Sequence, residues 1–153
     1  MFWANNDIIN MEIAIEMSRF NLKNNEVPVG VVLANKEGII AKSNNSMIKN
    51  NNPIFHAEID AINFAVKELN KKFLNDCDMY VTLEPCPMCA YAISLVKIGR
   101  VFIATTDSKF GGYTKLQLND KSKILSNYIP KIYFGLMELE ARKVINDFFK
   151  SKR

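Results

Sequence analysis

Two short motifs bring together the residue types that bind zinc in proteins. One is His56-Ala57-Glu58, and the other is Pro85-Cys86-Pro87-Met88-Cys89. Imidazole nitrogen and thiolate sulfur are ligands that a tetrahedral zinc ion prefers. Cys86 and Cys89 are three residues apart, so their sulfurs share one face where the chain is helical. His56 is the only histidine in the sequence, so any imidazole ligand must come from it.

Three protein ligands leave one tetrahedral position open, which is typical of a catalytic zinc site. We expect one zinc ion per chain, bound by His56, Cys86 and Cys89, and no organic cofactor. Glu58 follows His56 by two residues, so it lies near the metal and need not ligate it. A carboxylate in that place can take a proton from the attacking water and pass it to a substrate nitrogen. These roles together describe hydrolytic deamination.

Each motif is expected at the start of a helix. Apolar residues recur at helical spacing from Phe55 to Leu69, directly after His56. A second core helix is predicted from Met88 to Val96, with Pro87 where the first turn of a helix tolerates proline. Because a helix N-terminus favours negative charge, it also favours the thiolate form of cysteine.

The remaining elements predict an α/β fold. A first helix is expected from Asp7 to Asn24, and a hairpin from Glu26 to Ala34 and from Ile39 to Lys42. Polar loop residues at 43–53 precede the motif helix. Further strands are expected at 79–83, 100–104 and 131–134, a last helix at 136–149, and irregular chain at 105–130. This order predicts one domain over residues 1–153, in three α-β-α layers around a mixed five-stranded sheet.

Composition narrows the function only a little. The net charge of +4 and the pI of about 8.9 fit a nucleic-acid partner without requiring one. No apolar run is long enough to span a bilayer, and the first residues lack the pattern of a secretory signal, so a cytoplasmic protein is expected. Three cysteines, an odd number, argue against a disulfide framework. We expect Cys77 to be a small buried hydrophobe and Glu84 to orient neighbouring groups.

The two motifs resemble the signature of the cytidine deaminase-like superfamily, His-x-Glu followed by Pro-Cys-x-x-Cys, which is a known class of zinc deaminase. The similarity is closest to the bacterial tRNA adenosine deaminases and continues through nearly the whole chain. Besides the motifs, the matching segments are Glu26 to Gly30, Asn45, Pro53, Tyr80 to Cys89, Ile98 to Val101, Asp107 to Lys109 and Asp147 to Phe149. The segment from Gly111 to Lys115 departs from the small-residue run typical of the family.

The resemblance implies roles for single residues. His56, Cys86 and Cys89 would bind the zinc, and Glu58 would move the proton. Asn45 would bind the base through hydrogen bonds, Val29 and Leu83 would line the base pocket, and Asp107 would lie near the ribose of a neighbouring nucleotide. The family also implies a homodimer whose two subunits together shape the RNA groove.

The leading functional hypothesis is deamination of adenosine to inosine at the wobble position of a tRNA anticodon. Phosphates flanking the base need cations, which Lys109 and the tail residues Lys150, Lys152 and Arg153 could supply. One alternative is a metabolic deaminase of a free base or nucleoside, such as guanine or cytosine. Another is a non-catalytic zinc-binding subunit, against which the presence of Glu58 argues.

Overall fold

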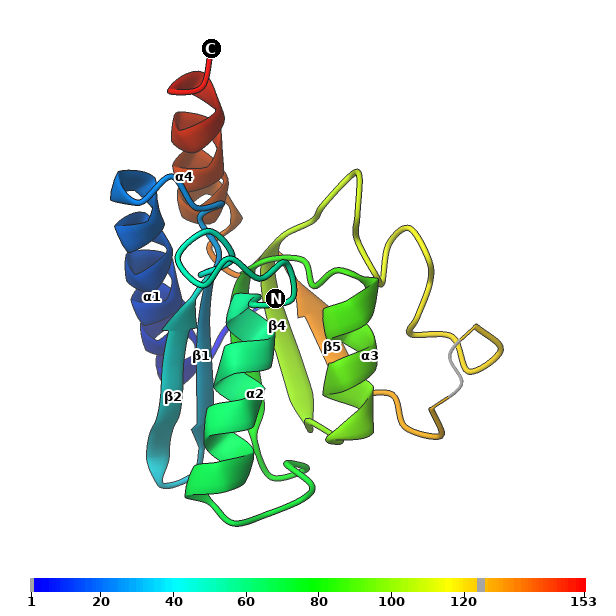
Figure 1. Cartoon of the computed structure of the whole chain (residues 1–153). Coiled ribbons are helices and arrows are strands. Elements are labelled where there is room, and N and C mark those ends of the chain that lie inside the picture. Colours follow the sequence, from blue (N-terminus) through cyan, green and yellow to red (C-terminus); the bar gives the residue numbers. More distant parts are fainter. Residues whose placement is uncertain (1, 124–125) are drawn as a thin grey trace.

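The computed structural model of the chain describes residues 2–123 and 126–153 (Figure 1). Helices and strands alternate for most of this length. In chain order they are α1 (Asn5–Phe20), the short 3-10 helix η1 (Asn21–Lys23), β1 (Gly30–Asn35), β2 (Gly38–Asn44), α2 (Ala57–Glu68), β3 (Asp78–Leu83), α3 (Pro87–Leu95), β4 (Arg100–Thr105), β5 (Lys131–Phe134) and α4 (Glu138–Lys150).

The strands form one mixed five-stranded sheet in the order β2-β1-β3-β4-β5. β1 pairs antiparallel with both β2 and β3, whereas β4 pairs parallel with β3 and with β5. The β1–β2 hairpin turns at Gly38, whose φ of +133° is readily adopted only by glycine. The crossover from β3 to β4 runs through α3, as parallel neighbours require. The predicted fold class is therefore confirmed.

Side chains that alternate along the strands divide the core into two layers. Val31 and Leu33 of β1 belong to the cluster that packs against α2 and α3. Val32 and Ala34 belong to the other cluster, with residues of α1 and α4. This is the period of two that a strand buried on both faces requires. Figure 1 shows the same layers, with α2 and α3 on one face and α1 and α4 on the other.

The first predicted strand starts four residues too early. Residues 26–29 are not part of the sheet, and β1 begins at Gly30. The backbone of Gly30 packs so closely on α1 that a Cβ there would lie 1.9 Å from the carbonyl oxygen of Ala14. Upstream of it, the side-chain amide of Asn21 donates a hydrogen bond to the carbonyl of Val27. The chain at 26–29 is therefore held by η1 and by the loop after β2, from which the N–H groups of Asn45 and Ile48 donate to Val29 and Glu26.

The other expected elements agree with the structure within a few residues. The first helix is divided, because α1 ends at Phe20 and η1 follows it. The described residues from 106 to 130 contain turns and irregular chain, as expected, and positions 124 and 125 of that segment lie outside the described residues. Within residues 2–123 and 126–153, no helix combines the length and apolar character needed to cross a membrane.

Candidate metal centre and active site

The two motifs occupy the first residues of two neighbouring helices. His56 is the residue before α2, with extended backbone, and Cys86 has the same place before α3. Pro87 is the first residue of α3, where its missing N–H group costs nothing. Both helices cover the same face of the sheet, and Figure 1 shows their first turns at the same end of the molecule. The chain thus brings together residues that are 30 and 33 positions apart.

The three predicted ligand atoms are spaced as a zinc ion needs them. Nδ1 of His56 lies 3.6 Å from Sγ of Cys86 and 3.6 Å from Sγ of Cys89. A tetrahedral zinc with ordinary Zn–N and Zn–S bonds of about 2.05 and 2.3 Å separates nitrogen from sulfur by about 3.6 Å. Within the described residues these are the three side chains that cluster closely enough to hold a metal ion. The donor set and its spacing therefore fit zinc.

Electrostatics treat the two cysteines differently, because the hydrogen bond that Cys89 donates to Cys86 raises the pKa of Cys89. A hydrogen bond from Cys89 lowers the pKa of Cys86 to about 4, so Cys86 is a thiolate at neutral pH. Glu58 lies in the first turn of α2 and is only 4% exposed. Burial raises the pKa of Glu58 to about 7. A carboxyl group in this range can both accept and return a proton near neutral pH.

Glu84 is a second buried carboxylate beside the ligands, but its surroundings are different. Its two oxygens accept hydrogen bonds from the backbone N–H groups of Asp107, Tyr113 and Thr114 at 3.0, 3.0 and 2.7 Å. The hydroxyl of Thr114 donates a further bond of 2.8 Å. With these four donors around it, Glu84 fixes the path of the chain after β4 and is not available as a base.

Two glycines let that chain segment lie against the metal loop. A Cβ on Gly111 would stand 2.5 Å from a carboxylate oxygen of Glu84, and one on Gly112 would stand 2.9 Å from Cβ of Ala90 in α3. From the sequence, Gly111-Gly112 was predicted to form a bend, and the contact of this bend with Glu84 was not predicted. The signal for close packing was the Gly-Gly pair, because glycine lets a backbone approach its neighbours closely.

Tyr113, next to the two glycines, was not singled out from the sequence. Its side chain is 3% exposed and belongs to the core layer under α2 and α3. Among the described residues, its hydroxyl is the buried side-chain group without a hydrogen-bond partner. Burial raises the pKa of Tyr113, and the nearby charge of Glu58 raises it further, so the hydroxyl stays protonated.

The residues expected to bind the base lie at the same end of the sheet as the ligands. Asn45 follows β2 and donates its backbone N–H to the carbonyl of Val29. The hydroxyl of Ser43 donates to the carbonyl of Ala57, which ties this end of the hairpin to the start of α2. Leu83 is half-buried at the end of β3. Val29, at 7% exposure, is covered by the core, and the roles of all three residues in binding stay predictions.

Asp107 belongs to the chain segment that Glu84 holds. Its Oδ1 accepts hydrogen bonds from the N–H groups of Lys109 and Phe110, at 2.8 and 3.0 Å. In the present structure Asp107 therefore shapes a turn directly after β4. A contact between its carboxylate and a ribose stays a prediction.

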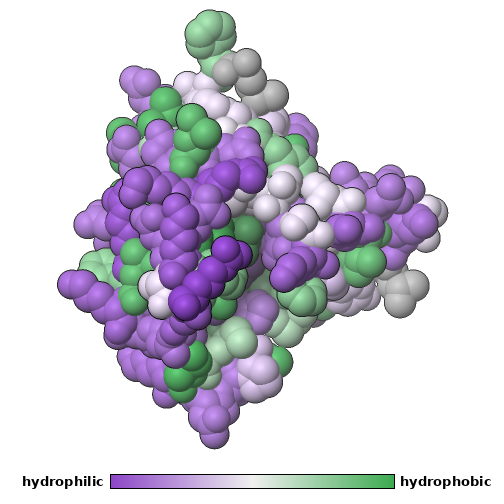
Figure 2. Space-filling model, turned by 90° about the horizontal axis from the view of Figure 1, so that it is seen from above, coloured by the Kyte–Doolittle hydropathy of each residue, from purple (hydrophilic) through white to green (hydrophobic). Residues whose placement is uncertain are grey.

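The predicted RNA-contacting cations are all exposed. Lys109 lies in the turn after β4, and Lys150, Lys152 and Arg153 lie at the end of α4, which rises toward the end of the molecule where α2 and α3 start (Figure 1). Nζ of Lys152 lies 5.3 Å from the ring centre of Phe148, a cation–π distance. Figure 2 looks onto this end and shows a mainly hydrophilic face with a recess near its middle.

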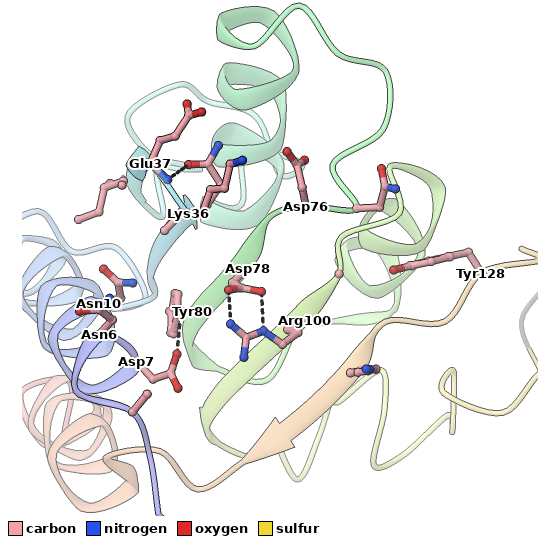
Figure 3. A pocket seen from close by; sticks show the side chains of 18 residues that line it. Asn6, Asp7, Asn10, Lys36, Glu37, Asp76, Asp78, Tyr80, Arg100 and Tyr128 are labelled. Atoms are coloured by element: carbon pink, nitrogen blue, oxygen red, sulfur yellow. Dashed lines mark hydrogen bonds and ion pairs between the residues drawn. The ribbon is translucent and has the colours of Figure 1, made fainter.

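A polar hollow of about 850 Å³ lies at the opposite end of the sheet (Figure 3). It is lined by the β1–β2 turn and the first residues of β3 and β4. Several of its polar groups are paired with one another: Arg100 makes two hydrogen bonds to Asp78, and the hydroxyl of Tyr80 donates to Asp7 at 2.7 Å. None of the metal-binding cluster lines it, so the chemistry predicted from the motifs does not belong there.

Comparison with known proteins identifies the class of this fold and site. The family model described as the cytidine and deoxycytidylate deaminase zinc-binding region matches residues 4–105, which include both motifs. The chain therefore belongs to the zinc-binding cytidine and deoxycytidylate deaminase family. The zinc cofactor predicted from the sequence is thereby confirmed, since the family binds zinc and the three side chains are spaced to hold it.

Several of its relatives in that family are named for tRNA. The tRNA-specific adenosine deaminase of Rickettsia felis is 40% identical over 145 residues, covering 94% of this chain and 100% of that protein. A solved tRNA:A34 deaminase is 35% identical, with a TM-score of 0.82 over 89% of this chain and 98% of its own. Guanine deaminase from Bacillus subtilis is 27% identical, with a TM-score of 0.63 over 82% of each chain. The resemblance to tRNA adenosine deaminases is confirmed.

Proposed function

We propose that this enzyme hydrolyses adenosine to inosine in tRNA, at the wobble position of the anticodon. The observation that carries the proposal is the His56, Cys86 and Cys89 cluster with the buried carboxyl group of Glu58 in the adjoining turn of α2. The named relatives support the choice of substrate, because they are tRNA-specific adenosine deaminases and a tRNA:A34 deaminase. Such a substrate is found in the cytoplasm, where we place the enzyme.

The chemistry divides between the metal and one side chain. Zinc held by His56, Cys86 and Cys89 would supply the nucleophile, because coordination lowers the pKa of water to about 7. Glu58 takes the proton from the attacking water, since burial sets its pKa near 7. The same carboxyl group passes that proton to a nitrogen of the purine ring and then carries the second proton of the added water to the leaving amine, so that ammonia departs. Glu84 holds the adjoining loop and takes no part in proton transfer.

Three residues at the end of the sheet are proposed to hold the adenine. The side-chain amide of Asn45 can both donate and accept, as the polar edge of a purine requires. Its only side-chain hydrogen bond among the described residues is a long one, of 3.6 Å to the sulfur of Met47, which a base can displace. Val29 and Leu83 supply apolar contacts to the ring, and Asp107 contacts the ribose of a neighbouring nucleotide.

The RNA and a second subunit complete the proposed assembly. Lys109, Lys150, Lys152 and Arg153 bind phosphates, and their exposure leaves them free to do so. We also propose a homodimer. Large apolar side chains are exposed on the two helices that carry the site, at Phe64 of α2 and at Met88 and Leu95 of α3, and a second copy would cover them.

The alternative is a deaminase of free bases, which the similarity to a guanine deaminase keeps open. One comparison separates the two: activity on an anticodon stem-loop, free adenosine, free guanine and cytidine, all at one salt concentration. We expect fast formation of inosine in the stem-loop and slow reaction of free adenosine, because contacts far from the reacting carbon supply binding energy that supports turnover. Fast turnover of guanine or cytidine together with an inert stem-loop would replace the proposal with the metabolic function.

A further inference from the structure

Phe110 is a large aromatic side chain that is exposed to solvent. It is 67% exposed, in a turn that is nonetheless fixed. Its own N–H and that of Lys109 both donate to the carboxylate of Asp107, at 3.0 and 2.8 Å. An exposed apolar side chain on such a turn is typical of a contact surface, because the hydrogen-bonded backbone loses little further conformational entropy when a partner binds.

Hydrogen bonds connect this turn to the active site. The N–H of Asp107 donates to Glu84, which directly precedes the Pro85-Cys86 metal loop. On the other side of Phe110, the close packing of Gly111 against the same Glu84 carboxylate fixes the chain again. In Figure 1 the chain after β4 rises in an arch above the starts of α2 and α3 and then returns to the start of α3. Phe110 is therefore anchored at the rim of the catalytic centre.

The ring of Phe110 has no aromatic or cationic partner within the described part of the chain, whereas the exposed rings of Phe73 and Phe149 do. Phe73 has the ammonium group of Lys97 over its ring at 4.3 Å, and Phe149 packs edge-on against Phe148 at 5.3 Å. No aromatic ring or cation of residues 2–123 and 126–153 is paired with Phe110 in this way. Its face is therefore available to a flat ligand.

We propose that Phe110 is a stacking platform for an unpaired base next to the target adenosine. The inference rests on the proposed function and names how the same site holds its RNA. Single-stranded loops expose base faces, and aromatic side chains bind these faces with little dependence on sequence. Lys109, adjacent in the chain and also exposed, supplies a cation for the phosphate of the stacked nucleotide. Phe110 thus selects an RNA loop over a free nucleoside.

The test compares Phe110→Ala and Phe110→Trp with the unmodified zinc-loaded enzyme on an anticodon stem-loop. Stacking of one base accounts for about a 5- to 150-fold change in affinity. We expect Phe110→Ala to raise KM by a factor in this range and to leave kcat nearly unchanged, and Phe110→Trp to restore KM. Phe73→Ala is the matched control, because it removes an exposed phenylalanine at the other end of the sheet.

A second readout does not depend on turnover. A stem-loop that already carries inosine at the target position is labelled with 2-aminopurine at each flanking nucleotide. Binding to the unmodified enzyme should quench one of these labels by stacking, and binding to Phe110→Ala should not.

The possible outcomes separate the two proposals. One outcome is that the unmodified enzyme forms inosine in the stem-loop while Phe110→Ala has the same KM and the same quenching. The proposed stacking role of Phe110 is then wrong, and the proposed function stands. If Phe110→Ala changes the sedimentation behaviour of the protein, its ring contacts a second copy of the chain and not a base. If the unmodified enzyme forms no inosine in the stem-loop, the proposed function itself fails.

Discussion

Glu58 and Glu84 are buried to almost the same extent, at 4% and 3% exposure, and each adjoins a metal-binding motif. Their surroundings give them different chemistry. Glu84 accepts hydrogen bonds from four donors, so its position is fixed. Burial dominates at Glu58 and raises its pKa to about 7. The surroundings of each carboxylate, and not its residue type, therefore decide its role, and Glu58 is the one assigned to proton transfer.

This assignment predicts the behaviour of Glu58→Ala. The variant should keep zinc and bind the stem-loop normally, and its kcat should fall by at least about 100-fold, the usual size of a general acid–base contribution. Elemental analysis, RNA titration and single-turnover kinetics measure the three quantities. Glu68→Ala, at the exposed end of the same helix, is the control. Loss of zinc would make Glu58 a ligand, and normal turnover would pass the proton role to another group.

Tyr113 gives a prediction about stability. Its buried hydroxyl has no partner among the described residues, so Tyr113→Phe removes an unsatisfied polar group and leaves the ring in place. We expect the free energy of unfolding to stay equal or to rise by about 1 kcal/mol, with zinc retained. Tyr80→Phe is the matched control and should lose about 1 kcal/mol, because the Tyr80 hydroxyl donates to Asp7. A clear loss of stability in Tyr113→Phe would show that its hydroxyl is bonded.

At the scale of elements, the active site depends on chain that belongs to no helix or strand. The turn at 107–110 and the two glycines after it connect β4 to the metal loop through Glu84. Gly111→Ala tests this packing, since its Cβ would lie 2.5 Å from the held carboxylate. We expect a loss of about 2 kcal/mol in unfolding free energy, from overpacking, and a raised KM for the stem-loop.

Ser108→Ala lies in the same turn and is exposed, so it should be close to neutral in both measurements. Chemical denaturation followed by circular dichroism, together with steady-state kinetics, measures the two effects. If Gly111→Ala is as stable and as active as Ser108→Ala, the loop accommodates the methyl group and Glu84 is not held as tightly as its hydrogen bonds indicate.

The metal joins two elements, because its ligands come from the starts of α2 and α3. Removing zinc with a chelator should abolish activity and lower the thermal midpoint, since binding to the folded state alone adds to stability. Hydrogen exchange should increase mainly at residues 56–59 and 86–90, while the strands stay protected. Activity without zinc, or a fourth protein ligand in the loaded enzyme, would contradict the open catalytic site.

The sequence predicted the elements well where the determinants are local. A valine-rich apolar run such as Val31 to Ala34 indicates a strand, and Pro87 indicates the first turn of a helix. It failed at residues 26–29, because the close contact of Gly30 with α1 is a tertiary effect. The hydrogen bonds from Asp107, Tyr113 and Thr114 to Glu84 connect residues 23 to 30 positions apart, so no local pattern reveals them. The ligands were predictable because zinc chemistry restricts the residue types.

At the scale of the whole molecule, the exposed cations of the turn and of the α4 tail predict salt-dependent RNA binding. If Lys109, Lys150, Lys152 and Arg153 all neutralise phosphates, the logarithm of affinity should fall with the logarithm of salt concentration with a slope of about −3. Replacing Lys150 and Lys152 by alanine should reduce this slope by roughly 1.4. Stem-loop titrations across a potassium chloride series measure it. An affinity independent of salt would exclude the proposed phosphate contacts.

The manner in which Glu84 holds the loop also bears on how such an enzyme changes over evolution. Three of its four bonds go to backbone N–H groups, at Asp107, Tyr113 and Thr114, and a backbone group is present whatever the side chain. The exposed positions between them, Ser108, Lys109 and Phe110, are therefore free to mutate without moving the metal loop. New preferences for substrate can arise at the rim of the site while the catalytic machinery is inherited intact.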